Sequence, residues 1–108
     1  MSALNKRLSG PGLITNAAVT KYTVPASTVT ILQHIHVYNP NVASIGFTMS
    51  IGADAAGTRL YDSFNISAGG TLDVFCKYTL TAAEIIQAFG STTNVLVLTL
   101  DGVELTAG

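Results

Sequence analysis

Two histidines, two positions apart, are the residues of this sequence with the clearest potential for chemistry. His34 and His36 lie in a stretch that alternates as a β-strand does, so both rings project from one face. Several β-barrel metal enzymes begin their ligand set with such a His-x-His pair. A third ligand is missing, because no Glu or His follows in the next predicted strand and the chain has only two histidines. A packed polar pair beside Tyr38 is therefore favoured over a metal site.

Other catalytic arrangements have less support. No Gly-x-Ser-x-Gly motif is present, and a serine triad would have to use one of the two strand histidines. The carboxylates are dispersed and stand mostly at predicted turns: Asp54, Asp62, Asp73, Glu84, Asp101 and Glu104. A glycosidase-like pair among them depends on distances that a sequence does not give. We expect no enzymatic activity, no cofactor and no metal ligand set.

Composition predicts a protein that is covered by neighbours. Charged residues make up 10% of the chain and hydrophobic residues 48%, with a net charge of −1, whereas soluble domains carry about 25% charged residues. The five cations are scattered, which argues against nucleic acid as a partner, and no apolar run is long enough to cross a membrane. Many surface side chains must then be small, apolar or aromatic, and a surface of this kind predicts a protein partner that covers it.

The first half of the chain alternates with a period of two. In residues 28–39 the apolar odd positions predict an inward strand face that Gln33 interrupts: Val29, Ile31, Ile35 and Val37. Asn39-Pro40-Asn41 predicts a turn. Alternation resumes from Ile45 to Ile51, and we expect these two strands to pair as a hairpin. Residues 60–66 predict a short strand with a bulge.

The second half continues the pattern. From 72 to 80 the even positions, Cys76 among them, face inward, and Phe75 lies on the outer face. Residues 81–90 allow either two helical turns, on the capping-box spacing of Thr81 and Glu84, or a turn and a strand over 85–89, which is preferred. Residues 95–100 read as a strand buried on both sides, and Asp101-Gly102 reads as a hairpin turn.

Short strands with Gly, Pro and Asn between them indicate an all-β fold, an antiparallel β-sandwich of the jelly-roll or Ig-like kind. We expect one β-sandwich domain over residues 13–108. Residues 1–12 end in Gly10-Pro11-Gly12 and lack the apolar core of a secretory signal. They are predicted to form an extended N-terminal arm or a frayed terminus.

Several strings of the sequence resemble the small β-sandwich structural proteins of tailed bacteriophage virions. The resemblance runs from about Val19 to Glu104 and rests on five strings: Tyr22-Thr-Val-Pro25, Val29 to Asn39, Ala68-Gly-Gly-Thr-Leu72, Leu80-Thr-Ala-Ala-Glu-Ile85 and Asp101-Gly-Val-Glu104. Ala83-Glu84 stands where Gly-Asp is more typical. The resemblance implies a virion component, either a capsid decoration (cement) protein or a minor tail protein.

That resemblance implies partners and a location. The partners are other copies of the chain, with a trimer favoured, and the major capsid or tail proteins; the place is the virion, after synthesis in the bacterial host cytoplasm. The candidate interface residues are Lys6, Arg7, Leu8, His34, His36, Tyr38 and Phe75. The alternative function is a carbohydrate- or receptor-binding β-sandwich module that uses exposed aromatic rings as platforms.

Overall fold

The computed structural model describes residues 2–106, and within this range the regular structure consists of β-strands without a helix. The strands are β1 (Ser2–Leu13), β2 (Val19–Thr23), β3 (Thr28–Tyr38), β4 (Ile45–Ile51), β5 (Arg59–Ile66), β6 (Thr71–Leu80), β7 (Ile85–Gly90) and β8 (Val97–Thr106). Because no helix occurs in this range, it contains no helical membrane span.

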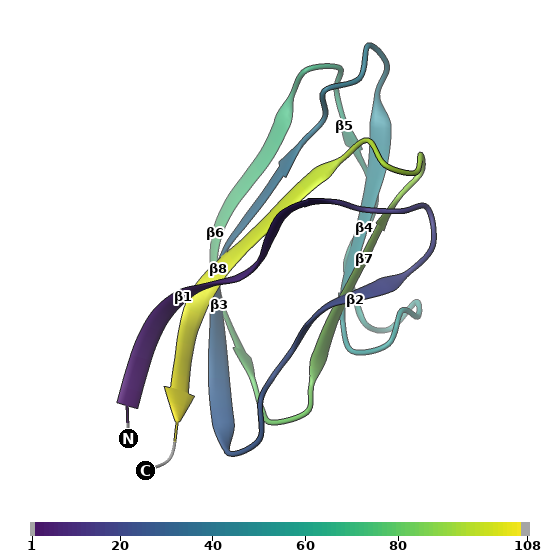
Figure 1. Ribbon diagram of the computed structural model, residues 1–108. Helices are drawn as coiled ribbons and strands as arrows, with labels where there is room; N and C mark the ends of the chain where they lie inside the picture. The colour runs from purple at the N-terminus through teal and green to yellow at the C-terminus, as the bar shows by residue number, and fades with distance from the viewer. Residues whose placement is uncertain (1, 107–108) are drawn as a thin grey trace.

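The strands form two antiparallel sheets that pack face to face (Figure 1). Sheet A has the order β1-β8-β3-β6, and sheet B has the order β2-β7-β4-β5. The core between them is made of inward side chains from both sheets, with Phe47, Leu32, Ile35, Met49 and Leu100 among those with no exposed surface. The predicted antiparallel β-sandwich is confirmed.

The N-terminal segment differs from the expected arm. It is extended, but as β1 it pairs with β8 from Ser2 opposite Thr106 to Leu13 opposite Val97. Its Leu8 side chain is buried in the core. The segment is therefore an edge strand of the domain rather than an appendage, because its backbone pairs with β8 along its length and its Leu8 side chain packs in the core.

The inward face of β3 changes parity at Gln33, which the sequence pattern did not anticipate. Thr30 and Leu32 are buried before Gln33, and Ile35 and Val37 after it. The pairing of β3 with both β6 and β8 shifts between Leu32 and His34. An extra residue in one strand has this effect, since it moves every later side chain to the other face. The expected inward positions of Val29 and Ile31 are therefore wrong.

The predicted hairpin of residues 28–39 with 45–51 is also wrong. β3 pairs with β6 and β8 in sheet A, whereas β4 pairs with β5 and β7 in sheet B. The turn at Asn39 carries the chain from one sheet to the other. Its buried side-chain amide donates to the carbonyl oxygens of Ala43 and Ile66, both at 2.9 Å. The turn residues thus reverse the chain without pairing its two arms.

Residues 81–90 form a turn and then strand β7, as preferred from the sequence. Glu84 accepts hydrogen bonds from the Thr81 backbone N–H at 2.6 Å and from its hydroxyl at 3.0 Å. These bonds close a tight turn in which Ala83 has a φ of 72°. The bonds that would cap a helix are therefore used to enter a strand, and they hold the pKa of Glu84 below its usual value.

The Asp101-Gly102 signal does not mark a hairpin turn. β8 runs without interruption from Val97 to Thr106 between β1 and β3. Its side chains alternate, with Leu98 and Leu100 buried and their neighbours partly exposed, so the run is not buried on both sides. Gly102 instead allows a close approach, because a Cβ there would lie 2.3 Å from the Ile31 carbonyl oxygen.

The predictions of strand faces hold for β4 and for most of β6, where Tyr78 is the exception at 41% exposed. β4 turns Phe47 and Met49 into the core, and irregular pairing of β4 with β5 confirms the bulge expected near residues 60–66. In β6, Leu72 and Leu80 are buried while Phe75 lies on the outer face and is 79% exposed. Cys76 is half-buried against the core, and this burial raises the pKa of its thiol.

Candidate functional site

The outer face of sheet A carries a row of side chains that spans all four strands. Arg7 on β1 is opposite Asp101 on β8, Asp101 is opposite His34 on β3, and His34 is opposite Phe75 on β6. Opposite residues of antiparallel strands share one face and lie close enough to interact. We call Arg7, Asp101, His34 and Phe75 the cross-strand row. It contains three of the predicted interface residues, namely Arg7, His34 and Phe75.

His34 is the centre of this row. Its Nδ1 lies 3.4 Å from an oxygen of Asp101, and its Nε2 forms a short hydrogen bond with Asp73. The Phe75 ring stacks on the imidazole at 4.5 Å between centroids with an interplanar angle of 10°. The hydrogen bond to Asp73, supported by Asp101, raises the pKa of His34 above its usual value although partial burial opposes this. The ring is thus held between two carboxylates beneath an exposed aromatic cover.

The fold places the other predicted interface residues in different parts of the molecule. His36 and Tyr38 follow His34 along the same face of β3, with 6.2 Å between the two imidazole centroids. Lys6 lies on β1, where its Nζ is 3.3 Å from Glu104. Leu8 is 9% exposed and belongs to the core, so its assignment to an interface is wrong: the alternation of β1 turns it inward while Arg7 faces out.

A pH dependence follows from the contacts of His34. A histidine whose folded-state pKa is raised stabilises the fold fully below its unfolded pKa, and that contribution is lost as pH rises through the folded pKa. We expect the wild type to lose unfolding free energy as pH rises above about 6.5, the ordinary pKa of histidine, and Asp73→Asn to lose less. Urea unfolding at several pH values measures both. Parallel pH profiles of the two proteins would contradict the assignment.

A second polar group joins the two sheets inside the sandwich. Tyr22 of β2 donates its hydroxyl to Glu104 of β8 in a short hydrogen bond and lies 2.7 Å from the Thr30 hydroxyl of β3. Lys6 pairs with the other oxygen of Glu104. The carboxylate is only 8% exposed, and buried charges are tolerated when they are paired and hydrogen-bonded. The group is a structural clasp, with the pKa of Tyr22 raised to about 12 by burial and by Glu104.

Replacing Tyr22 with Phe tests this clasp. The change leaves buried Glu104 without one donor, and we expect the free energy of unfolding to fall by about 1–3 kcal/mol. Tyr38→Phe is the matched control, since Tyr38 is on the outer face, and it should change stability by less than about 0.5 kcal/mol. An alkaline absorbance titration should also lose its highest tyrosinate step in Tyr22→Phe only. Equal effects of the two changes on stability would refute the clasp.

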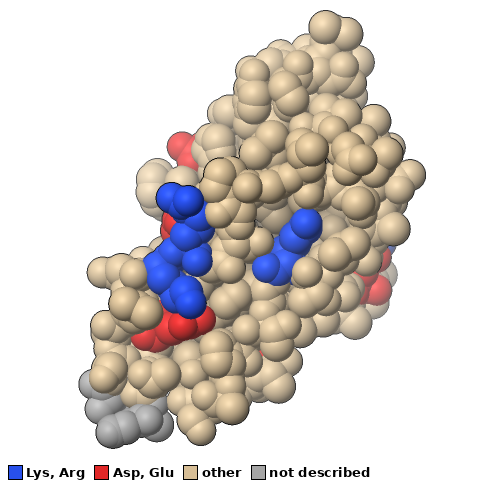
Figure 2. All heavy atoms as spheres, in the orientation of Figure 1, with Lys and Arg blue, Asp and Glu red and all other residues tan. Residues whose placement is uncertain are grey.

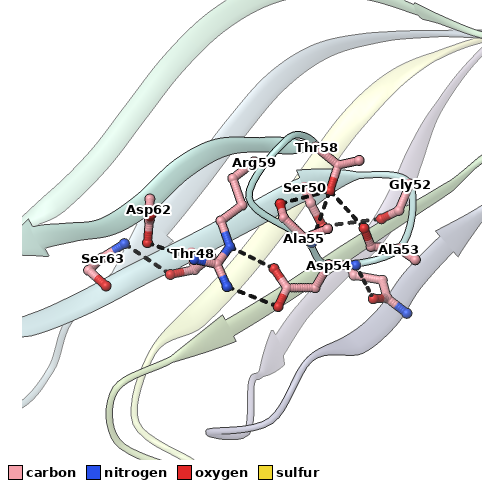
Figure 3. Close-up of polar contacts among 11 residues, drawn as sticks. Thr48, Ser50, Gly52, Ala53, Asp54, Ala55, Thr58, Arg59, Asp62 and Ser63 are labelled. Carbon is pink, nitrogen blue, oxygen red and sulfur yellow. Dashed lines mark hydrogen bonds and ion pairs between the residues drawn. The ribbon is translucent and has the colours of Figure 1, made fainter.

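The outer face of sheet B holds an ion-pair cluster that the sequence did not reveal (Figure 3). Arg59 at the start of β5 donates to both oxygens of Asp54, at 2.9 and 3.1 Å, and to Asp62 at 3.0 Å. Arg59 holds the pKa of Asp54 below its usual value. The Asp54 N–H also donates to the side chain of Gln87 on β7 at 2.9 Å. These bonds fasten the loop between β4 and β5 onto its sheet.

The sites considered from the sequence differ in what the structure brings together. The two histidines do share one face, but residues 2–106 contain no group of three or more His, Cys, Asp or Glu placed to hold a metal ion. No pocket is found over the same part of the chain. The cross-strand row was missed as a unit, since Asp73 and Asp101 join His34 only through the register of non-adjacent strands. The Tyr22–Glu104 contact likewise joins residues far apart in the sequence.

The strand order defines the class of this fold. Sheets ordered β1-β8-β3-β6 and β2-β7-β4-β5 make an eight-stranded jelly roll, the type of sandwich found in viral capsid and lectin domains. This order distinguishes it from the Ig-like alternative.

Comparison with known proteins gives a likeness in fold to a solved structure. No protein-family model and no curated protein sequence matches the chain. Among solved structures, it resembles a chain in the structure of infectious bursal disease virus, Gx strain, with a TM-score of 0.53 and 9% sequence identity. The likeness covers 99% of the present chain and 32% of the viral one, so this chain spans about a third of the length of its structural neighbour. At that identity the likeness shows the fold.

Proposed function

We propose that this chain is a non-enzymatic structural protein of a virus particle, which it stabilises through subunit–subunit contacts. Two facts support the proposal: the jelly roll is a fold of viral capsid domains, and the solved neighbour belongs to a virus structure. The observation that carries it is the number of large apolar side chains on the surface. Those more than a third exposed are Leu4, Leu13, Val19, Tyr38, Val42, Phe64, Phe75 and Tyr78.

The few charges of the chain do little to offset this apolar surface. Lys6 and Arg7 pair with carboxylates of β8, and Arg59 pairs with two aspartates. The face of the molecule in Figure 2 is accordingly mostly neither acidic nor basic. A surface with so few charges, three of whose five cations pair within the chain, is poorly suited to isolation in water and well suited to burial against other subunits.

The finer proposal follows the sequence resemblance. The particle is a tailed-phage virion, and the chain is a capsid decoration protein or a minor tail protein. Its partners are then its own copies, a trimer included, and the major capsid or tail proteins. Its location is the virion after synthesis in the bacterial host cytoplasm.

Quantitative mass spectrometry of purified particles of the encoding virus tests this function. We expect the chain to co-purify with the particles in fixed proportion to the major capsid protein. A ratio near that of the capsid subunits indicates decoration, and a small fraction of it indicates a tail position. Particles that lack the chain after infection, while it accumulates free in the lysate, would reject the virion role. In a second assay, particles of a virus that lacks the gene are heated with and without these lysates. The comparison shows whether added protein restores heat resistance.

One observation favours a second function, a carbohydrate- or receptor-binding module. The Phe75 ring is 79% exposed and lies flat on His34, and jelly rolls include lectin domains. A glycan array probed with the wild type and with Phe75→Ala distinguishes the functions. Binding that disappears in the variant supports recognition, and an array without signal supports the structural role.

A further inference from the structure

The outer face of β6 carries side chains in an order that is symmetric about its middle. Along the strand, alternate residues point away from the core, and all of them are exposed: Thr71, Asp73, Phe75, Lys77 and Thr79. Phe75 is the centre, oppositely charged residues flank it at equal distances, and threonines stand at both ends. Read in reverse, the series exchanges only the acid and the base.

β6 is also an edge strand with little protection. It ends sheet A, and among the described strands it pairs with β3 alone (Figure 1). The other edges carry features that discourage pairing: β1 has Pro11 and two irregularities of register, β2 is only 5 residues long, and β5 is bulged. β6 is 10 residues long, and its burial alternates from Thr71 to Lys77, with a single shift of register in its pairing with β3. Long regular edges of this kind are templates for another strand.

We propose that two copies of this chain pair through β6 in antiparallel fashion about a two-fold axis at Phe75. This arrangement places Asp73 opposite Lys77 of the partner copy and Lys77 opposite Asp73 of the partner copy. Phe75 meets its own equivalent, and each Thr71 meets a Thr79. Opposite-charge, aromatic and threonine pairs are the favourable cross-strand combinations. The two A sheets become one continuous sheet whose core-facing sides remain on one side.

The charges select this register over its neighbours. An axis at Asp73 or at Lys77 sets like charges opposite each other, which is destabilising. An axis at Val74 or Cys76 leaves neither charge opposite its counterpart. An axis between two residues turns the outer face of one copy into the core face of the other. Phe75 is therefore the centre at which both charges are satisfied and both cores stay covered.

The inference specifies how two copies of the chain meet in the self-association that the proposed function includes. In that respect the inference rests on the proposed function. It uses only β6 and applies to the free protein, so it can fail without affecting the virion role. Equally, a β6 dimer in solution would persist if the chain were absent from every particle. The two proposals are separable by experiment.

Charge-swapped variants test the register directly. In Asp73→Lys both facing positions are basic, and in Lys77→Asp both are acidic. By sedimentation equilibrium we expect the wild type to dimerise, each variant alone to associate at least about tenfold more weakly, and their equimolar mixture to form heterodimers. A monomeric wild type, unchanged association of either variant, or a mixture no tighter than its components would overturn the proposal.

A control separates the charge pair from the contacts of His34. Asp73→Lys removes a hydrogen bond to His34 as well as reversing a charge. Asp101→Asn also removes a His34 contact but lies on β8 inside the sheet. It is expected to dimerise as the wild type does. A dimer lost equally in Asp101→Asn would assign the effect to His34 and would count against the β6 pairing.

Disulfide trapping locates the axis and does not depend on charge. In a Cys76→Ser background, Phe75→Cys sets two cysteines opposite each other with Cα atoms about 4.5–5.5 Å apart, which a disulfide spans. Thr71→Cys in the same background is the matched control, since its two copies would lie about 26 Å apart along the strands. Rapid oxidation to a covalent dimer by Phe75→Cys alone supports the axis. Equal cross-linking of the two variants would exclude it.

Discussion

Replacing Ile35 with Asp is expected to leave no folded protein. Ile35 has no exposed surface and lies in the middle of β3, opposite Leu100 on one side and Val74 on the other. A carboxylate in that position has no partner for its charge, and burying it costs several kcal/mol. Because the whole domain is held by about 5–15 kcal/mol, this one change consumes most or all of the stability. Soluble yield and far-ultraviolet circular dichroism measure the outcome.

Ile31→Asp is the informative control for that experiment. Simple alternation along β3 makes Ile31 and Ile35 equivalent, whereas the irregularity at Gln33 turns Ile31 to the outer face and leaves Ile35 in the core. We therefore expect Ile31→Asp to fold with a loss well below that of Ile35→Asp, while Leu32→Asp unfolds. Unfolding by Ile31→Asp together with tolerance of Leu32→Asp would show that the strand keeps unbroken alternation.

The faces of β4 and β6 could be predicted largely from the sequence, whereas the face of β3 could not. Alternation predicted the inward Phe47 and Met49 of β4 and the outward Phe75 of β6. In β3 the extra residue reversed the parity of only part of the strand. The polar Gln33 was the visible signal, but it was interpreted as an exception on one face instead of a change of face.

Turns were located more reliably than strand partners. The residues at Asn39 and at 81–84 do reverse the chain, because turn chemistry is local. Which strands then pair depends on contacts between distant segments, and β3 proved to have both its sides occupied by β6 and β8. The hairpin rule fails here because the Asn39 turn joins the two sheets of the sandwich.

The candidate interface was predictable only in its parts. His34, Phe75 and Arg7 could each be assigned to a strand face or a segment, yet their assembly into one row needs the register of four strands at once. Of the two carboxylates that hold His34, Asp101 was interpreted as a turn residue, and it belongs to strand β8. Register across a sandwich is set by the core as a whole, so no local pattern contained this site.

Gly102→Ala is expected to be strongly destabilising for so conservative a substitution. Glycine was taken from the sequence as part of a turn, but in β8 it faces inward between β1 and β3, where an added Cβ would lie 2.3 Å from the Ile31 carbonyl oxygen and 3.0 Å from a methyl group of Leu8. Backbone on a central strand cannot move aside without breaking its pairing, so we expect a loss of about 1–3 kcal/mol and a fall in Tm of about 4–8 °C for each kcal/mol. Gly12→Ala on β1 is the control, because its Cβ would meet no atom within 4 Å. Calorimetry of both proteins decides the matter: equal Tm values would mean that β8 and β3 do not approach as closely as the structure has them.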